Sequence, residues 1–318
     1  MSKVKQFTRE NGWIWAALGA VVLWLVMGIF SGKLNIESFL SNAYIASFLA
    51  ILAFGQMLVV TSGRGAIDLS IPGVVTLSAF VTMATVNGSN AKVIVALILV
   101  VALGALIGFL NSMLTIYVQI PAMIGTMAMN YILTTAALLF NKRFSVFKTA
   151  PILDSFSKLR IFGIQAMIYV AVIITIILWF VMAKTPFGKS LSALGQNRDA
   201  AKFAGINVLK VEILAYIISS ILAAVGGFFI AARAGNAILG MGDSYTMETV
   251  ASVVVGGTLM SGGKANVIGT LAGCLFLNLV VTSMQIMGFG PGAQNVAKGL
   301  LIIIVFILGV GDVRGKSK

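Results

Sequence analysis

The amino-acid sequence predicts an all-α fold, a polytopic integral membrane bundle with about ten transmembrane segments. Three observations predict it. The 318 residues are 59% hydrophobic and only 10% charged, whereas about a quarter of the residues in soluble domains are charged. The mean hydropathy is +1.04. Long apolar runs recur without the alternating pattern of barrel strands, and a helix needs about 20 apolar residues to cross a bilayer.

The predicted spans form a single transmembrane domain over residues 1–318. Their bounds are 13–30, 41–61, 71–87, 93–117, 121–140, 162–183, 211–232, 248–260, 266–288 and 295–311. The second and eighth segments end in glycine-rich stretches, so we expect some spans to be broken or re-entrant. The first is longer than a typical signal sequence and has no cleavage site, so we expect it to be retained.

The basic residues favour an orientation with both termini and the loop 184–210 in the cytoplasm. Basic residues gather on the cytoplasmic side of membrane proteins. This loop carries Lys184, Lys189, Arg198, Lys202 and Lys210. The same rule explains the net charge of +13, so we expect no nucleic-acid partner. The bias is modest, because basic residues also occur on the other side.

The exception is the loop 141–161, which this orientation places outside the cytoplasm. It contains Lys142, Arg143, Lys148, Lys158 and Arg160 against one acid, Asp154. One interpretation is that a late loop tolerates charge once earlier spans have set the orientation. The other is a docking surface for an acidic soluble partner, because complementary charge speeds encounter.

Several catalytic and metal sites are excluded by composition. The chain has no histidine and one cysteine, so it lacks the Ser-His-Asp and Cys-His arrangements and the usual zinc sites. Two glycine–lysine pairs do not complete the phosphate-loop pattern G-x-x-x-x-G-K-[ST]. Lys264 is followed by Ala265 rather than by serine or threonine, and the first glycine that Gly188-Lys189 would need is replaced by Ala183. We therefore predict no catalytic residue, no metal and no ATP hydrolysis by this chain.

The break after the second segment holds an acid close to the membrane. Asp68 follows a glycine-rich turn, and Ser70 can cap the next helix, which has Pro72 in its first turn. Intramembrane acids are costly and often functional. The alternative is that Asp68 pairs with Arg64 or caps the helix. Residues 62–66 and 261–265 have similar sequences, but the similarity is too short to establish an internal repeat.

The cytoplasmic loop contains a predicted short helix. Asn197 can cap a helix from Arg198 to Ala204, and Gly205 is suited to end it. Its small residues Ala200 and Ala201 stand beside Phe203. The helix is either an ordinary surface helix or a lever that fits a groove on a cytoplasmic partner.

Polar residues within the spans are few. An uncharged polyol would need such groups along its path, although each can instead bond a neighbouring helix. Glu248, ahead of an apolar run, is either a charge at a helix N-terminus or a pathway residue. The candidates for a translocation pathway are Gln56, Asp68, Ser70, Asn111, Asn130 and Glu248.

Three motifs together resemble the permease subunits of ribose-type sugar ABC importers, which also move xylose and galactose. The first is Ala66-Ile67-Asp68-Leu69-Ser70. The second comprises Gly195, Asn197, Ala200, Ala201, Gly205 and Ile206, and the third comprises Glu248, Gly256, Gly257, Thr258, Gly262 and Gly263. The sequence departs from the family pattern at Arg64, which lengthens the first motif, at Pro72 and at Lys264. These departures suit a permease that pairs with a different permease.

The resemblance implies the partners. Two permeases, the same chain or homologous ones, would form the pathway in the lipid of a bacterial inner membrane. An ATP-binding subunit, carrying ATP and Mg²⁺, would dock on Gly195, Asn197, Arg198, Ala200, Ala201, Phe203, Gly205 and Ile206. A periplasmic or extracellular sugar-binding protein would deliver the sugar. This chain would need no cofactor.

Three other functions remain open. A permease of the same superfamily would carry branched-chain amino acids or nucleosides. A stand-alone ion-coupled carrier fits less well, because proton relays need intramembrane acids and few are present. A membrane enzyme fits less well still, because histidines and paired carboxylates are missing. The identity of the sugar is not encoded in any of these patterns.

Overall fold

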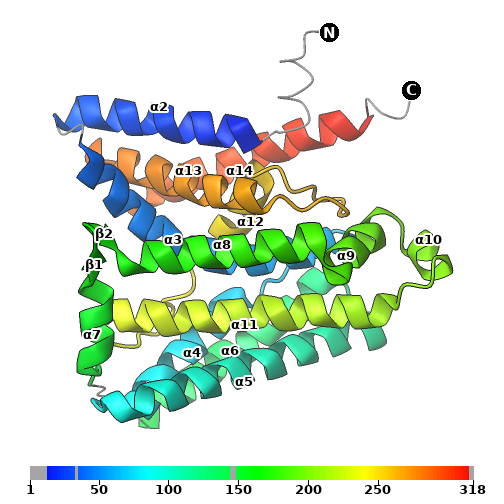
Figure 1. The fold of residues 1–318 in the computed structure, drawn as a ribbon, viewed down its shortest axis with the longest axis horizontal. Helices are drawn as coiled ribbons and strands as arrows, with labels where there is room; N and C mark the ends of the chain where they lie inside the picture. Colours follow the sequence, from blue (N-terminus) through cyan, green and yellow to red (C-terminus); the bar gives the residue numbers. More distant parts are fainter. Residues whose placement is uncertain (1–12, 33–34, 144–147, 315–318) are drawn as a thin grey trace.

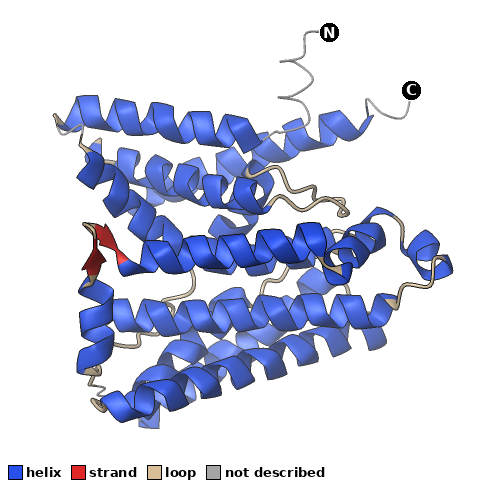
Figure 2. Cartoon of the chain, viewed as in Figure 1, coloured by secondary structure: helices blue, strands red, loops and turns tan. Residues whose placement is uncertain are grey.

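The computed structural model describes residues 13–32, 35–143 and 148–314, and most of this part is helical (Figure 2). The longer helices are α2 (Trp13–Ser31), α3 (Ile36–Thr61), α4 (Ile71–Val86), α5 (Val93–Ser112), α6 (Ala122–Arg143), α8 (Ala166–Lys184), α11 (Val208–Ala234), α13 (Val267–Ile286) and α14 (Pro291–Arg314). The shorter elements are η1 (Asn90–Lys92), η2 (Met113–Tyr117), α7 (Pro151–Lys158), β1 (Arg160–Ile161), β2 (Ile164–Gln165), α9 (Pro186–Gln196), α10 (Arg198–Phe203) and α12 (Tyr245–Val255).

The lengths of the helices fit a protein that crosses a membrane several times. Six helices in the described residues are long and apolar enough to span a bilayer, and three shorter apolar helices cover Ile14–Ile29, Ile71–Val86 and Tyr245–Val255. The polytopic helical class is therefore confirmed. The predicted count of about ten spans is not, because α4 and α12 are shorter than the roughly 20 residues that a full crossing needs.

Helix α11 lies at the centre of the bundle and packs against α3, α4 and α5. Glycines let the backbones approach closely, which is how helices associate in membranes. A Cβ at Gly104 or Gly108 of α5 would lie 2.7 Å from the Ser220 carbonyl oxygen or 2.5 Å from that of Tyr216. A Cβ at Gly55 of α3 would lie 2.8 Å from the Ser219 oxygen. The central contacts therefore depend on the absence of side chains.

Both predicted helix breaks are present. Helix α3 ends at Thr61, and α4 begins at Ile71 with Pro72 in its first turn. The eighth predicted segment is shorter than expected, because α12 ends at Val255 rather than at residue 260. Gly257, Gly262 and Gly263 have φ of +83°, +89° and +81°, and no right-handed helix can pass through such residues.

The sixth predicted segment, 162–183, begins too early. Residues 160–165 form a small antiparallel hairpin in which Arg160 pairs with Gln165, and α8 starts at Ala166. Phe162 and Gly163 at its tip have φ of 50° and 81°, as in the tight turns that favour hairpins. Apolar composition alone could not distinguish this hairpin from the start of the helix.

The short elements lie at opposite ends of the long helices (Figure 1). The hairpin and α7 lie at one end of α8 and α11, and α9 and α10 lie at the other. Helix α2 begins and α14 ends toward the end that carries α9 and α10. The bundle therefore has two distinct ends, and each carries one group of candidate residues.

Candidate translocation and coupling sites

Asp68 lies in the break between α3 and α4 and is only 2% exposed. Its Oδ1 accepts hydrogen bonds from the backbone N–H and the hydroxyl of Ser70, at 3.0 and 2.6 Å. Its Oδ2 accepts one from the Ser219 hydroxyl on α11, at 3.2 Å. The described residues show no ion pair between Asp68 and Arg64, whose side chain is exposed. Neutral donors therefore hold the carboxylate.

Ser70 occupies the N-cap position of α4, but its side chain makes no capping hydrogen bond. The predicted N-cap position is therefore confirmed, but the side-chain hydrogen bond expected of an N-cap residue is absent. The hydroxyl donates to Asp68 instead and accepts a hydrogen bond from Asn111 Nδ2 at 2.8 Å. Asp68 organises the turn immediately before the helix, which is close to the capping role given above as the alternative.

Three further side chains hold the same break and the first turn of α4 that follows it. The Gln56 amide, oriented so that both its ends are satisfied, donates to the Asp68 carbonyl at 3.1 Å and accepts the Asp68 N–H at 3.2 Å. Thr126 Oγ1 accepts the Leu69 N–H at 2.9 Å. Asn130 Oδ1 accepts the Gly73 N–H at 2.8 Å. Four helices besides α4 therefore hold one loop by its polar groups.

Five of the six predicted pathway residues thus belong to one cluster, formed by Gln56, Asp68, Ser70, Asn111 and Asn130. Sequence reasoning missed two other members, Thr126 and Ser219, because a hydroxyl inside an apolar run usually bonds its own helix. Most of the cluster is fully buried. Within this chain it stabilises the broken helix, and contact with a substrate stays a prediction.

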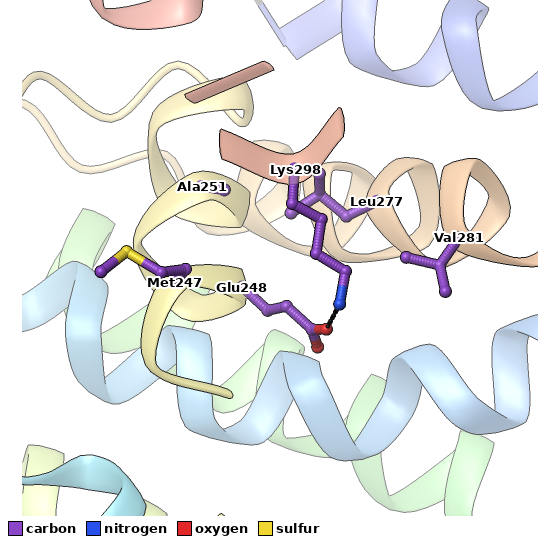
Figure 3. A pocket seen from close by; sticks show the side chains of 6 residues that line it. All are labelled: Met247, Glu248, Ala251, Leu277, Val281 and Lys298. Atoms are coloured by element: carbon purple, nitrogen blue, oxygen red, sulfur yellow. Dashed lines mark hydrogen bonds and ion pairs between the residues drawn. The ribbon is translucent and has the colours of Figure 1, made fainter. Parts of the chain in front are cut away.

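Glu248, the sixth candidate, lies apart from this cluster. Its Oε1 forms an ion pair with Lys298 Nζ of α14 at 2.5 Å, and Figure 3 shows the two side chains directed toward each other. The side chains are 17% and 16% exposed. The space beside them has a volume of about 10 Å³, enough for about one water molecule. The geometry is that of an ion pair joining α12 to α14.

The predicted short helix in the loop 184–210 is present as α10. Asn197 Oδ1 accepts the Ala200 N–H at 2.9 Å and caps it, and Gly205 follows with φ of +81°. Arg198 Nη1 lies 2.6 Å from Glu212 Oε2, which joins α10 to α11. Ala201 is buried, whereas Phe203 is 91% exposed. An apolar ring therefore stands out from the end of the protein.

The predicted docking residues at the opposite end differ in their contacts. Lys158 pairs with Asp154 at 2.7 Å, and Arg160 pairs with Glu37 at 3.3 Å. Lys142 and Lys148 are exposed. The side chain of Arg143 lies outside the described residues. Phe162, at the tip of the hairpin, is 97% exposed. The ion pairs reduce the positive charge that this surface offers to an acidic partner.

Comparison with known families identifies the chain. Residues 35–309 match the family model described as branched-chain amino acid transport system / permease component. The chain belongs to this permease family. The match covers both helix breaks and both ends of the bundle. The family is one of membrane components of transport systems rather than enzymes.

Relatives of this permease carry names that refer to sugars. The ribose import permease protein RbsC of Bacillus subtilis is 30% identical over 92% of this chain and 90% of its own. RbsC of Escherichia coli K12 is 30% identical over 81% of each chain. The galactose/methyl galactoside import permease protein MglC of Haemophilus influenzae is 28% identical over 89% of this chain and 90% of its own. No solved structure matches the chain.

In this permease, the described residues contain no group of three or more His, Cys, Asp or Glu side chains that could hold a metal ion. Cys274 is buried within the bundle. Two groups of predicted residues are each brought together by the fold: the Asp68 cluster, and the residues of α9 and α10 at one end of the bundle.

Proposed function

We propose that the chain is the membrane-spanning subunit of a binding-protein-dependent ABC importer for a monosaccharide. One observation carries the proposal: the similarity to ribose and galactose import permeases extends over about nine-tenths of the chain. The three motifs of the resemblance lie in the two helix breaks and in α9–α10, which are the elements that a gated pathway with an external motor needs.

In this proposal, the end with α9 and α10 faces the cytoplasm, together with both termini. A separate subunit that binds ATP and Mg²⁺ docks there, and the exposed Phe203 ring is the apolar contact at its centre. Aromatic residues that become buried in the complex commonly dominate the binding energy of such interfaces. A second permease, identical or homologous, completes the pathway, and a sugar-binding protein docks at the end with the hairpin.

A transport assay tests the proposal. The chain, its partner subunits and the binding protein are reconstituted in liposomes, and uptake of labelled monosaccharides is measured with and without internal ATP. We expect uptake of one sugar that requires ATP. Uptake without ATP would support an ion-coupled carrier and contradict the proposal.

The second candidate is import of a branched-chain amino acid, because the description of the matching family names that substrate. The same liposomes distinguish it when leucine and a nucleoside are added to the panel. ATP-dependent uptake of leucine without uptake of any sugar would replace the monosaccharide with an amino acid and leave the importer class unchanged.

The docking assignment has a matched pair of variants. Phe203 and Phe162 are exposed rings, 91% and 97% accessible, at opposite ends of the bundle. We expect Phe203→Asp to reduce copurification of the ATP-binding subunit and Phe162→Asp to leave it unchanged. Equal copurification with both variants would contradict docking through α10.

A further inference from the structure

The two breaks in the helices meet each other at the end of the bundle that carries α9 and α10. The Gly263 N–H donates to the Thr61 carbonyl oxygen at 2.9 Å. Thr61 ends α3, where helical carbonyls have no partner within their own helix. A Cβ at Gly262 would overlap the Gly63 Cα and lie 2.7 Å from the Gly63 nitrogen. The loop after α12 therefore completes the end of α3.

A third segment, the end of α9, enters the same contact. A Cβ at Gly195 would overlap the Thr61 carbonyl oxygen and the Gly263 nitrogen. A Cβ at Gly63 would lie 3.1 Å from the Gly195 Cα. Gln196 Nε2 donates to the Gly263 carbonyl at 3.4 Å. We call this contact of Thr61–Gly63, Gly195–Gln196 and Gly262–Gly263 the glycine junction.

The junction joins backbones directly, and this determines what it can transmit. A contact through side chains can yield by changing rotamers, whereas a backbone contact with no side chain between can yield only if a whole segment moves. Gly195 has no positive φ, so its requirement for glycine comes from the contact alone. The junction therefore binds the end of α9 to both breaks as one unit.

On its outer side, the junction is connected to α10 and to open space. Asn197 follows Gln196 at once and caps α10, whose Arg198 is held to α11 by the ion pair with Glu212. A cavity of about 220 Å³ lies against the junction and is lined by Ser62–Arg64 and Leu194–Arg198. The space is lined by the junction itself and by the first residues of the loop into α10.

On its inner side, the junction leads to both halves of the bundle. Asp68 and its buried hydrogen bonds stand only five residues after Gly63. In the other direction, the loop after Gly263 leads into α13, which Asn266 caps through the Gly269 N–H at 2.9 Å. A displacement at Gly195 thus reaches each break through one backbone contact followed by a few residues of chain.

We infer that the glycine junction is the coupling element through which a displacement of α10 reaches both helix breaks at once, with Gly195 as its positioning residue. This inference rests on the proposed importer function. In the proposed function, α10 only provides the surface on which the ATP-binding subunit docks. The inference adds that a backbone contact behind α10 transmits its movement.

The first test separates coupling from assembly. In liposomes containing the complete transporter, Gly195→Ala is compared with Gly292→Ala, a control whose added Cβ meets nothing within 4 Å. We expect Gly195→Ala to keep ATP hydrolysis that the binding protein stimulates and to lower uptake per ATP hydrolysed about ten-fold, a typical size for coupling between sites. The control should match the original protein.

The inference would be overturned if Gly195→Ala had the same uptake per ATP hydrolysed as the original protein, whether both activities are retained or both fall in proportion. Failure of the proposed function is a different result, because the original protein itself would then show no ATP-dependent uptake.

A second measurement does not depend on the folding of Gly195→Ala. Spin labels are attached in the original sequence at Lys202→Cys of α10 and Ser261→Cys of the second break, both exposed positions. A second pair joins Lys202→Cys to Phe162→Cys at the opposite end. The labelled chain is diluted with unlabelled chain in the complete complex, so that distances between two copies are not measured. The native Cys274 is buried and therefore does not take up the label.

On addition of ATP and Mg²⁺, we expect the distance from 202 to 261 to stay constant and the distance from 202 to 162 to change. A change in the first distance as large as the second would show that α10 moves independently of the break. No change in either distance would show that α10 does not move relative to the far end. Each of these two results would overturn the inference.

Discussion

The two helix breaks differ in what holds them. The break between α3 and α4 is held by side chains, since the Asp68 carboxylate and the Gln56, Asn111 and Asn130 amides bond its backbone and hydroxyl groups. The break between α12 and α13 is held mainly by close backbone contact. A Cβ at Gly256, where the break begins, would lie 2.5 Å from the Gly269 carbonyl oxygen, and a Cβ at Gly273 of α13 would overlap the Ser252 carbonyl oxygen of α12 beside the break.

This difference teaches which substitutions each break can tolerate. A loop held by buried hydrogen bonds is sensitive to the loss of a polar atom, because an unsatisfied buried group costs free energy. A loop held by backbone contact is sensitive to the gain of any atom, because a packed interior resists overfilling. Four substitutions test the comparison, in order of expected effect.

Asp68→Ala should have the largest effect. It removes the acceptor of three hydrogen bonds at the first break. Stranding buried donors costs about 1–3 kcal/mol each, so we expect a loss of about 4 kcal/mol in the free energy of unfolding. The thermal unfolding midpoint in detergent measures it. The control is Asp154→Ala, since Asp154 pairs with Lys158 at the surface. Equal midpoints for the two variants would contradict the assigned role of Asp68.

Lys298→Ala should cost about 2–3 kcal/mol, because breaking a largely buried ion pair leaves the other charge without its partner. The pair joins α12 to α14 and precedes the second break. The double variant Glu248→Gln with Lys298→Met should recover much of the loss, because it leaves no unpaired charge. If the double variant is as unstable as the single one, the ion pair is not the source of the effect. Unfolding midpoints of both variants provide the comparison.

Gly273→Ala should destabilise the packing of α13 on α12, the helices that flank the second break, by about 2 kcal/mol, because the added methyl group overlaps the Ser252 carbonyl oxygen. Gly299→Ala on α14 is the matched control, since its Cβ would meet nothing within 4 Å. The unfolding midpoint should fall for the first variant and stay constant for the second. A midpoint of Gly273→Ala that equals the control would show that α12 and α13 are not held by backbone contact.

Thr258→Val should have the smallest effect, about 1 kcal/mol, because it removes one hydrogen bond with little change in shape. Thr258 Oγ1 accepts the Asn266 N–H at 3.1 Å in the second break. Thr126→Val, which removes the acceptor of the Leu69 N–H, is the counterpart in the first break. We expect the midpoint to fall further for Thr126→Val. The reverse order would remove the distinction between the two breaks.

Local features were predicted from sequence with good success. The two ends of α10 are marked by Asn197 and Gly205, as predicted, because capping depends on residues within one turn of each other. The break after Thr61 was predicted because glycines and a proline act on their own backbone. The hairpin at 160–165 was missed because its pairing competes with an apolar run that is equally compatible with a helix.

The sequence by itself determined the membrane class, the positions of the breaks and the ends of α10, because hydropathy and backbone preference act over a few residues. Only the tertiary structure decided which side chains contact each other across the bundle. Asp68 bonds Ser219, 151 residues away, rather than the neighbouring Arg64. Glu248 pairs with Lys298, and the two similar loops meet at Gly195. Such contacts depend on which helices pack together, and that choice is made by shape and by the satisfaction of buried polar groups over the whole bundle.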